Sequence, residues 1–140
     1  MKTKIFITAV LFLLCAAVFP LAAQQSNTIG PPSWMQGSWT YTETLPDEMG
    51  GGEAEFSVRF NANDILFDAE ESLGELIRSG EVAVFTQNAG SSSYEIYIEY
   101  SDGYWWRETF QRPAAGASTM RSTYETSDGE NDECIYTRQQ

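Results

Sequence analysis

The feature that most constrains the fold is a strict alternation of apolar and polar residues in two neighbouring segments. Residues 94–100 (YEIYIEY) carry large apolar side chains at every second position, and residues 104–112 (YWWRETFQR) alternate similarly, with Glu108 among the apolar positions. The Asp102-Gly103 pair between them is a two-residue hairpin signal. Because a period of two places alternate side chains on opposite faces of a strand, the two segments predict an antiparallel hairpin with one apolar face.

Turn residues divide the rest of the chain into further short segments of the same kind. In all, we expect eight strands, at residues 37–45, 53–61, 65–69, 82–87, 94–100, 104–112, 119–126 and 133–138. This regular spacing predicts an antiparallel up-and-down barrel or a sandwich. Residues 70–78 instead space their apolar side chains as in a helix, so a short helix or an irregular crossover is expected there.

The first 23 residues have the pattern of a secretory signal peptide. Two lysines precede an apolar run at residues 5–18, and small residues at positions 22 and 23 favour cleavage after Ala23. A transmembrane anchor is less favoured, because the run is short and lacks charged stop-transfer flanks. Lipidation of Cys15 is also less favoured, because the two residues before it are large leucines.

Removal of residues 1–23 leaves an acidic chain. Its 20 acidic residues and six arginines give a net charge of −14, compared with −12 for the whole chain. This charge argues against binding to nucleic acid or to an anionic membrane surface. The lack of His removes the commonest general base and metal ligand. Cys134 alone allows no internal disulfide, which for an exported domain suits a bacterial periplasm or the extracellular space.

The remaining chain divides into two parts. Residues 24–36 are mostly polar and contain Gly30-Pro31-Pro32, so we predict a linker or N-terminal arm. Residues 37–140 form the single predicted β-domain.

Two short motifs at the ends of this domain carry a family resemblance. Gly37-Ser38-Trp39 opens the first strand and Tyr136-Thr137-Arg138 closes the last. The pair resembles the calycin pattern, in particular small bacterial secreted lipocalin-like domains, in which the Trp plugs one end of an eight-stranded barrel and the Arg lies across its ring. The resemblance implies an eight-stranded up-and-down barrel closed by Trp39 and Arg138. The Thr-Asp-Tyr motif and the disulfide of typical lipocalins are absent, which implies a reduced relative.

Aromatic residues on the inward positions of the expected strands define a candidate ligand site. Barrels of eight strands can hold one small ligand, and they can also be filled by their own side chains. The aromatic set is therefore either the wall of an apolar cavity or a packed core. The candidate ligand-binding residues are Tyr41, Phe56, Trp106, Glu108, Phe110 and Tyr124.

Glu108 is the polar member of this set. An unpaired buried carboxylate is costly, so one interpretation is a polar anchor for a ligand or an acid with a raised pKa. The alternatives are an ion pair with Arg59, Arg107 or Arg138, or a shifted register that turns Glu108 toward water.

Two other features give less specific predictions. The acidic run at residues 128–133 is too short for an EF-hand loop and has its Gly misplaced, so it predicts a solvated hairpin tip. Trp105 is expected on the outer face beside Arg107, where it either marks a partner surface or packs against the N-terminal arm. We predict no metal, no cofactor and no catalytic residue.

The leading functional hypothesis is therefore non-enzymatic binding of a small apolar or amphipathic molecule inside the barrel. The first alternative is an acidic envelope protein with a filled barrel that binds an unknown protein partner through its outer face or loops. An enzyme that uses Glu108 is the least favoured hypothesis, because no nucleophile–base pair can be assembled without His.

Overall fold

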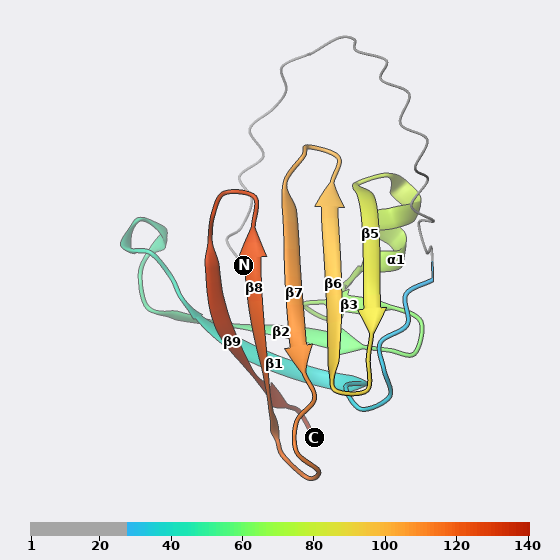
Figure 1. The fold of residues 1–140 in the computed structure, drawn as a ribbon. Coiled ribbons are helices and arrows are strands. Elements are labelled where there is room, and N and C mark those ends of the chain that lie inside the picture. Colours follow the sequence, from blue (N-terminus) through green and yellow to red (C-terminus); the bar gives the residue numbers. More distant parts are fainter. Residues whose placement is uncertain (1–27) are drawn as a thin grey trace.

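Nine strands form one antiparallel sheet that curls into a half-barrel, with one short α-helix beside its edges (Figure 1). The computed structural model describes residues 28–140; the expected signal peptide and its cleavage position lie outside these residues. The strands are β1 (Gly37–Thr44), β2 (Glu53–Phe60), β3 (Ile65–Phe67), β4 (Glu71–Ser72), β5 (Val82–Ala89), β6 (Ser93–Tyr100), β7 (Trp105–Gln111), β8 (Thr119–Thr126) and β9 (Asn131–Arg138). The helices are the 3-10 turn η1 (Asp47–Met49) and α1 (Leu73–Ser79). None of the helices among residues 28–140 is long and apolar enough to cross a membrane.

The strand order along the sheet is β4-β3-β2-β1-β9-β8-β7-β6-β5. Consecutive strands pair with each other, and the first strand, β1, pairs with the last, β9. The up-and-down antiparallel arrangement that the alternation predicts is therefore confirmed. The expected closed barrel of eight strands is not formed: the sheet has nine strands, and closure would pair β4 with β5, whereas the hydrogen-bonded order ends at these two strands.

The ninth strand, β4, is the one that the sequence did not predict. It has two residues, which pair with β3 after a tight turn in which Asp68 and Ala69 adopt positive φ angles of 49° and 65°. Two residues are too few to show an alternating pattern, so no periodicity could have revealed this strand. The other eight strands coincide with the eight expected segments to within a few residues at their ends.

Helix α1 lies where helical spacing was expected. The Ser72 side chain caps its start by accepting a hydrogen bond from the Glu75 amide at 3.1 Å, and Gly80, with φ of 82°, ends it. Leu73 and Leu76 face the core and are buried. The helix packs against β3, β4 and β5, so it lies between the two edges of the sheet (Figure 1).

The described part of the predicted arm, residues 28–36, contributes to the core rather than lying apart from it. Ile29 is 4% exposed and Met35 is fully buried. The Trp39 indole N–H donates a hydrogen bond to the Met35 carbonyl at 2.8 Å. Gln87 on β5 also fixes this segment, because its side chain accepts from the Gly30 amide and donates to the Thr28 carbonyl.

The first and last strands meet at Trp39 and Arg138, as the motif resemblance implies. The Arg138 guanidinium lies 4.2 Å from the centre of the Trp39 ring, and the two residues are opposite each other in the β1–β9 pairing. The guanidinium also donates to the carbonyls of Gln36 at 2.9 Å and Trp34 at 3.2 Å. Gly37 has φ of 125°, and a Cβ atom there would lie 2.9 Å from Arg138 Nη1, so this position requires glycine.

The core fills only one end of the curled sheet. The strand registers place the fully buried side chains Trp39, Phe60, Tyr94, Phe110 and Met120 at the end where β1, β6 and β8 begin and β2 and β7 finish. At the opposite end Ile98 is still buried, but most inward aromatic side chains are only partly buried, namely Tyr41, Phe56, Trp106 and Tyr124. The two ends of one sheet therefore differ: one is packed and the other is hollow.

Candidate ligand cavity

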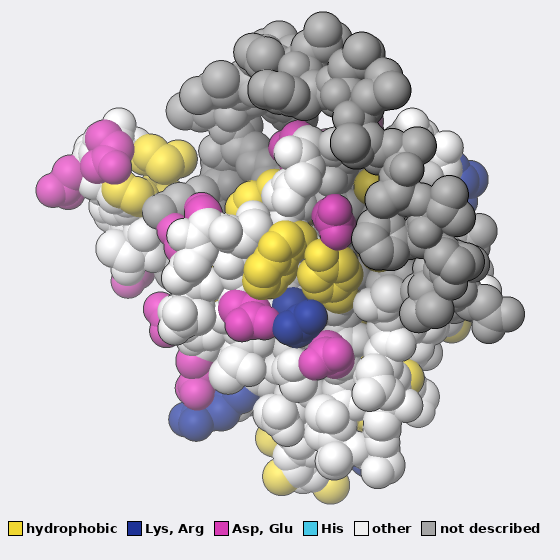
Figure 2. Space-filling model, turned by 45° about the horizontal axis from the view of Figure 1, so that its top comes forward, with side chains coloured by type: hydrophobic (Ala, Val, Ile, Leu, Met, Phe, Trp, Pro, Cys, Tyr) yellow, Lys and Arg dark blue, Asp and Glu magenta, His cyan; other side chains and the backbone are white. Residues whose placement is uncertain are grey.

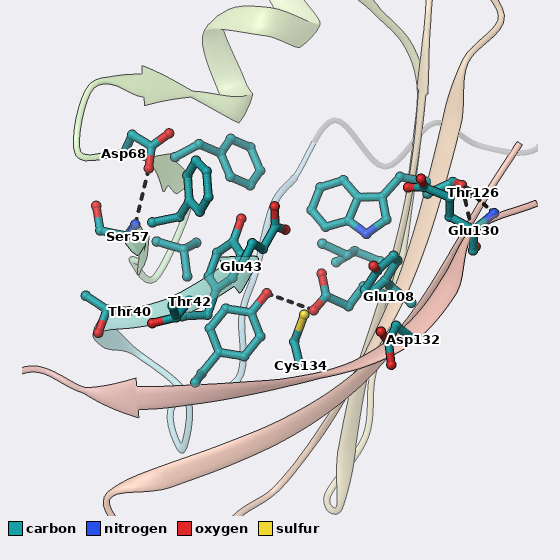
Figure 3. Close-up of a pocket in the computed structure, with 18 of the residues that line it drawn as sticks. Thr40, Thr42, Glu43, Ser57, Asp68, Glu108, Thr126, Glu130, Asp132 and Cys134 are labelled. Atoms are coloured by element: carbon teal, nitrogen blue, oxygen red, sulfur yellow. Dashed lines mark hydrogen bonds between the residues drawn. The ribbon is translucent and has the colours of Figure 1, made fainter. Parts of the chain in front are cut away.

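A cavity of about 1380 Å³ occupies the hollow end of the sheet (Figure 3). Side chains from every strand except β5 line it. β1 and β9 pair only at Trp39–Arg138 and Thr40–Thr137, and beyond this point both strands line the cavity without pairing to each other. The cavity is thus a consequence of strand divergence after the packed end.

All six residues that the sequence nominated as a ligand site line this one cavity, namely Tyr41, Phe56, Trp106, Glu108, Phe110 and Tyr124. The alternative that we considered, a core filled by side chains alone, applies only to the packed end of the sheet. Tyr41 stacks on Phe56 with ring centres 5.4 Å apart, and it also contacts Tyr136 at 5.0 Å. Trp106 meets Phe67 edge to face at 5.8 Å. The walls are therefore largely aromatic.

Glu108 is buried at the base of the cavity, with 3% of its surface exposed. The Ser122 hydroxyl and the Tyr136 hydroxyl both donate hydrogen bonds to its Oε1 atom, the second at 2.8 Å. The interpretation that Glu108 faces water is therefore wrong. Among the described residues the expected ion pair is also not found. The hydroxyl partners are neutral, Arg59 is at an exposed position on β2, Arg107 bonds to Glu125 on the outer face and Arg138 lies over Trp39.

Burial without a cationic partner changes the acidity of Glu108. Desolvation raises its pKa from the usual 4.5 to about 7, and hydrogen bonds from Ser122, Tyr136 and Trp106 oppose this rise. A carboxyl with this pKa is partly protonated near neutral pH.

The neighbours of Glu108 are themselves titratable but stay neutral. Burial and the nearby Glu108 charge raise the pKa of Cys134 to about 12, and the same two causes raise the pKa values of Tyr41 and Tyr136. Burial also raises the pKa of Tyr124, on which Glu108 acts more weakly. A thiol with such a high pKa is almost entirely un-ionised at neutral pH and is a poor nucleophile.

Three members of the site were not nominated from the sequence. Tyr136 was noted only as part of the motif in the last strand, Cys134 only as a lone cysteine, and Ser122 was not singled out. Alternation along β8 and β9 puts all three on the inner face. The hydroxyl groups of Ser122 and Tyr136 at inward strand positions could have indicated this role, because a buried carboxyl requires hydrogen-bond donors.

The outer face carries a second aromatic group. Trp105 and Tyr97 lie with ring centres 5.9 Å apart, and the Arg107 guanidinium covers both rings at 5.9 Å and 5.5 Å. Arg107 also pairs with Glu125 at 2.8 Å. Trp105 therefore faces outward as expected. Figure 2 shows one face of the molecule with a hydrophobic patch, a basic group beside it and acidic groups around it.

Metal binding has no support in the described part of the chain. Among residues 28–140, no group of three His, Cys, Asp or Glu side chains is placed to hold a metal ion. The acidic run at residues 128–133 forms the turn between β8 and β9 and the start of β9. Within it, Asp128 accepts a hydrogen bond from the Thr126 hydroxyl.

Comparisons with protein-family models, with curated proteins and with solved structures found no match to this chain.

Proposed function

We propose that this chain is an exported, non-enzymatic binding protein of lipocalin-like type that holds a small amphipathic molecule in its cavity. The observation that carries the proposal is the hollow end of the sheet, where aromatic walls surround about 1380 Å³ and one buried carboxyl. Pockets that bind small ligands are mostly apolar with a few placed polar groups. The up-and-down sheet and the Trp39–Arg138 contact support the lipocalin-like part of the proposal.

The chemistry of the cavity favours binding over catalysis. Cys134 is the only thiol among residues 28–140, and its pKa of about 12 makes it a weak nucleophile. Glu108 accepts both of its described hydroxyl hydrogen bonds on Oε1, which suits a fixed polar anchor. An apolar molecule with one polar group would match this arrangement.

The test is binding of the neutral fluorescent probe N-phenyl-1-naphthylamine. We expect one probe per protein, with energy transfer from tryptophan to the probe, and Trp106→Ala should weaken binding by at least tenfold. Trp105→Ala is the matched control, because it removes the same side chain from the adjacent position on the opposite face of β7. Urea unfolding of both variants shows whether each is folded, and Trp106→Phe supplies a milder change if Trp106→Ala is not.

Failure of the wild-type protein to bind any apolar or amphipathic probe would remove this function. It would favour the second candidate, in which a protein partner binds the outer face. The partly exposed stack of Tyr97, Trp105 and Arg107 on the outer face is the observation that supports that alternative. Loss of partner binding in Trp105→Ala, with no effect of Trp106→Ala, would then be expected.

Export is part of the same proposal and rests on the N-terminal sequence alone. We expect the mature protein to begin at Gln24, because small residues precede that position. N-terminal sequencing of the protein from its natural envelope tests this. A chain that retains Met1, or that begins at a lipid-modified Cys15, would contradict it.

A further inference from the structure

The described charged residues that line the cavity are all acidic. Among the described residues that line it, ten are Asp or Glu and none is Lys or Arg. Strand alternation places Glu43, Glu108 and Asp132 on the inner face itself. Figure 3 shows Asp68 on one side of the cavity, Glu130 and Asp132 on the other, and Glu108 between them.

The six arginines of residues 28–140 all lie elsewhere. Arg107 and Arg121 are on the outer face, the first bound to Glu125 and the second 3.5 Å from the rim residue Glu133. Arg138 is at the packed end over Trp39. The other three are at exposed positions on β2, on α1 and after β7, namely Arg59, Arg78 and Arg112. An anionic ligand in the cavity would therefore find no described cation to pair with.

The electrostatic effects of the acids overlap within the cavity. Glu108 and Asp68 both raise the pKa of Tyr41, and Glu108 and Asp132 both raise the pKa of Cys134. These groups come from the turn after β3, from β7 and from β9, so negative potential reaches the cavity from several sides. A concave, low-dielectric site lined by one sign of charge concentrates ligands of the opposite sign.

The aromatic walls complement a positive group in a second way. Ten of the lining residues are Phe, Tyr or Trp. The faces of such rings attract ammonium groups, and the attraction reaches about 2 kcal/mol when the cation is desolvated. A carboxylate at the base of an aromatic cavity adds a direct partner for the same positive group.

From this arrangement we infer that the cavity selects cationic amphiphiles, that is, amines or quaternary ammonium compounds with an alkyl or aryl body. The inference rests on the proposed binding function and names its ligand class. The ammonium head lies among Glu108, Asp132 and the aromatic rings, and the apolar body lies against the remaining walls. Fatty acids and other anionic amphiphiles are excluded by the same charges.

The experiment compares three ligands that differ only in head-group charge. Decylammonium, 1-decanol and decanoate are titrated at pH 8 by calorimetry and by displacement of N-phenyl-1-naphthylamine, below their micelle concentrations. We expect decylammonium to bind at least tenfold more tightly than 1-decanol, and decanoate more weakly than either. Added salt should weaken the binding of decylammonium and leave the binding of 1-decanol unchanged, because salt screens only the interaction of the charged ligand.

Two variants locate the selectivity. Glu108→Gln and Asp132→Asn keep the side-chain shapes. Each should lower the affinity for decylammonium several-fold, while the affinity for 1-decanol should change by less than twofold. Glu75→Gln is the matched control, because Glu75 is an exposed acid on α1 that does not line the cavity. If Glu108→Gln is not folded at pH 8, Asp132→Asn, at an exposed position, still tests the inference.

The outcomes separate this inference from the proposed function. Equal binding of the three ligands, or tighter binding of decanoate, would overturn the cationic selectivity and leave the binding function intact. Selectivity that Glu75→Gln reduces as much as Glu108→Gln and Asp132→Asn would also overturn it, since it would then reflect net charge. If neither the three ligands nor the probe binds, the binding function itself fails.

Discussion

The wild-type fold should lose stability as the pH rises, and replacement of Glu108 by Gln should remove this loss. The folded-state pKa of Glu108 is about 7, above the usual value of 4.5. Between these two pH values the folded protein holds a proton that the unfolded chain has released, so this group stabilises the fold fully below pH 4.5. That stabilisation is lost as the pH rises through about 7.

The magnitude follows from the two pKa values. One pKa unit corresponds to about 1.4 kcal/mol, so the difference between 4.5 and about 7 corresponds to about 3 kcal/mol. Gln mimics the protonated acid: its carbonyl oxygen can accept the hydrogen bonds from Ser122 and Tyr136, and its amide replaces the protonated oxygen. We therefore expect the variant to match the wild type near pH 4 and to be about 3 kcal/mol more stable at pH 8.

Urea unfolding of both proteins between pH 4 and pH 8 measures this difference. Subtraction cancels the contribution of the other acids, which both proteins share. The pKa values of Tyr41, Tyr124, Cys134 and Tyr136 are all raised, so these groups stay neutral throughout the range. A difference that does not change with pH would refute the reasoning, and so would a wild type that gains on the variant as pH rises, which would indicate a cationic partner.

Three further substitutions test the packed end of the fold by urea unfolding. Arg138→Ala should cost about 1–3 kcal/mol, because it removes the contact with Trp39 and two hydrogen bonds to backbone carbonyls; a loss below about 0.5 kcal/mol would contradict this role. Gly37→Ala should cost about 2 kcal/mol, because of its positive φ and its 2.9 Å approach to Arg138, and the cost should fall in the Arg138→Ala background. Ser72→Ala should cost about 1–2 kcal/mol, because it removes the cap of α1, and an unchanged stability would show that the cap is not needed.

The strand pattern could be predicted because it depends on local alternation. Each of the eight expected segments carries the period of two within its own residues, and the turn signals between them are equally local. The inward position of Trp106 and Glu108 followed from the same alternation, since a slip of one residue would have turned both outward. The candidate site was therefore accessible from the sequence once the strands were assigned.

What could not be predicted depends on how distant segments meet. The polarity of residues 24–36 suggested an arm, but Ile29 and Met35 find buried positions because the packed end needs apolar side chains to cover Trp39. The partners of Glu108 come from β8 and β9, and nothing in the local sequence of β7 identifies them. The open edges at β4 and β5 depend on the crossover through α1, which occupies the space where those strands would otherwise pair.

The proposed binding function accounts for the hollow end of the sheet. At the packed end the inward positions carry large apolar side chains, which bury themselves favourably and leave little space. At the other end inward positions carry Glu43, Glu108 and Asp132. An apolar residue at position 108 would avoid the desolvation that raises the Glu108 pKa to about 7. The buried carboxyl of Glu108 therefore lowers the stability of the fold at the point where the aromatic walls meet. Residues that lower stability in this way are typical of functional sites.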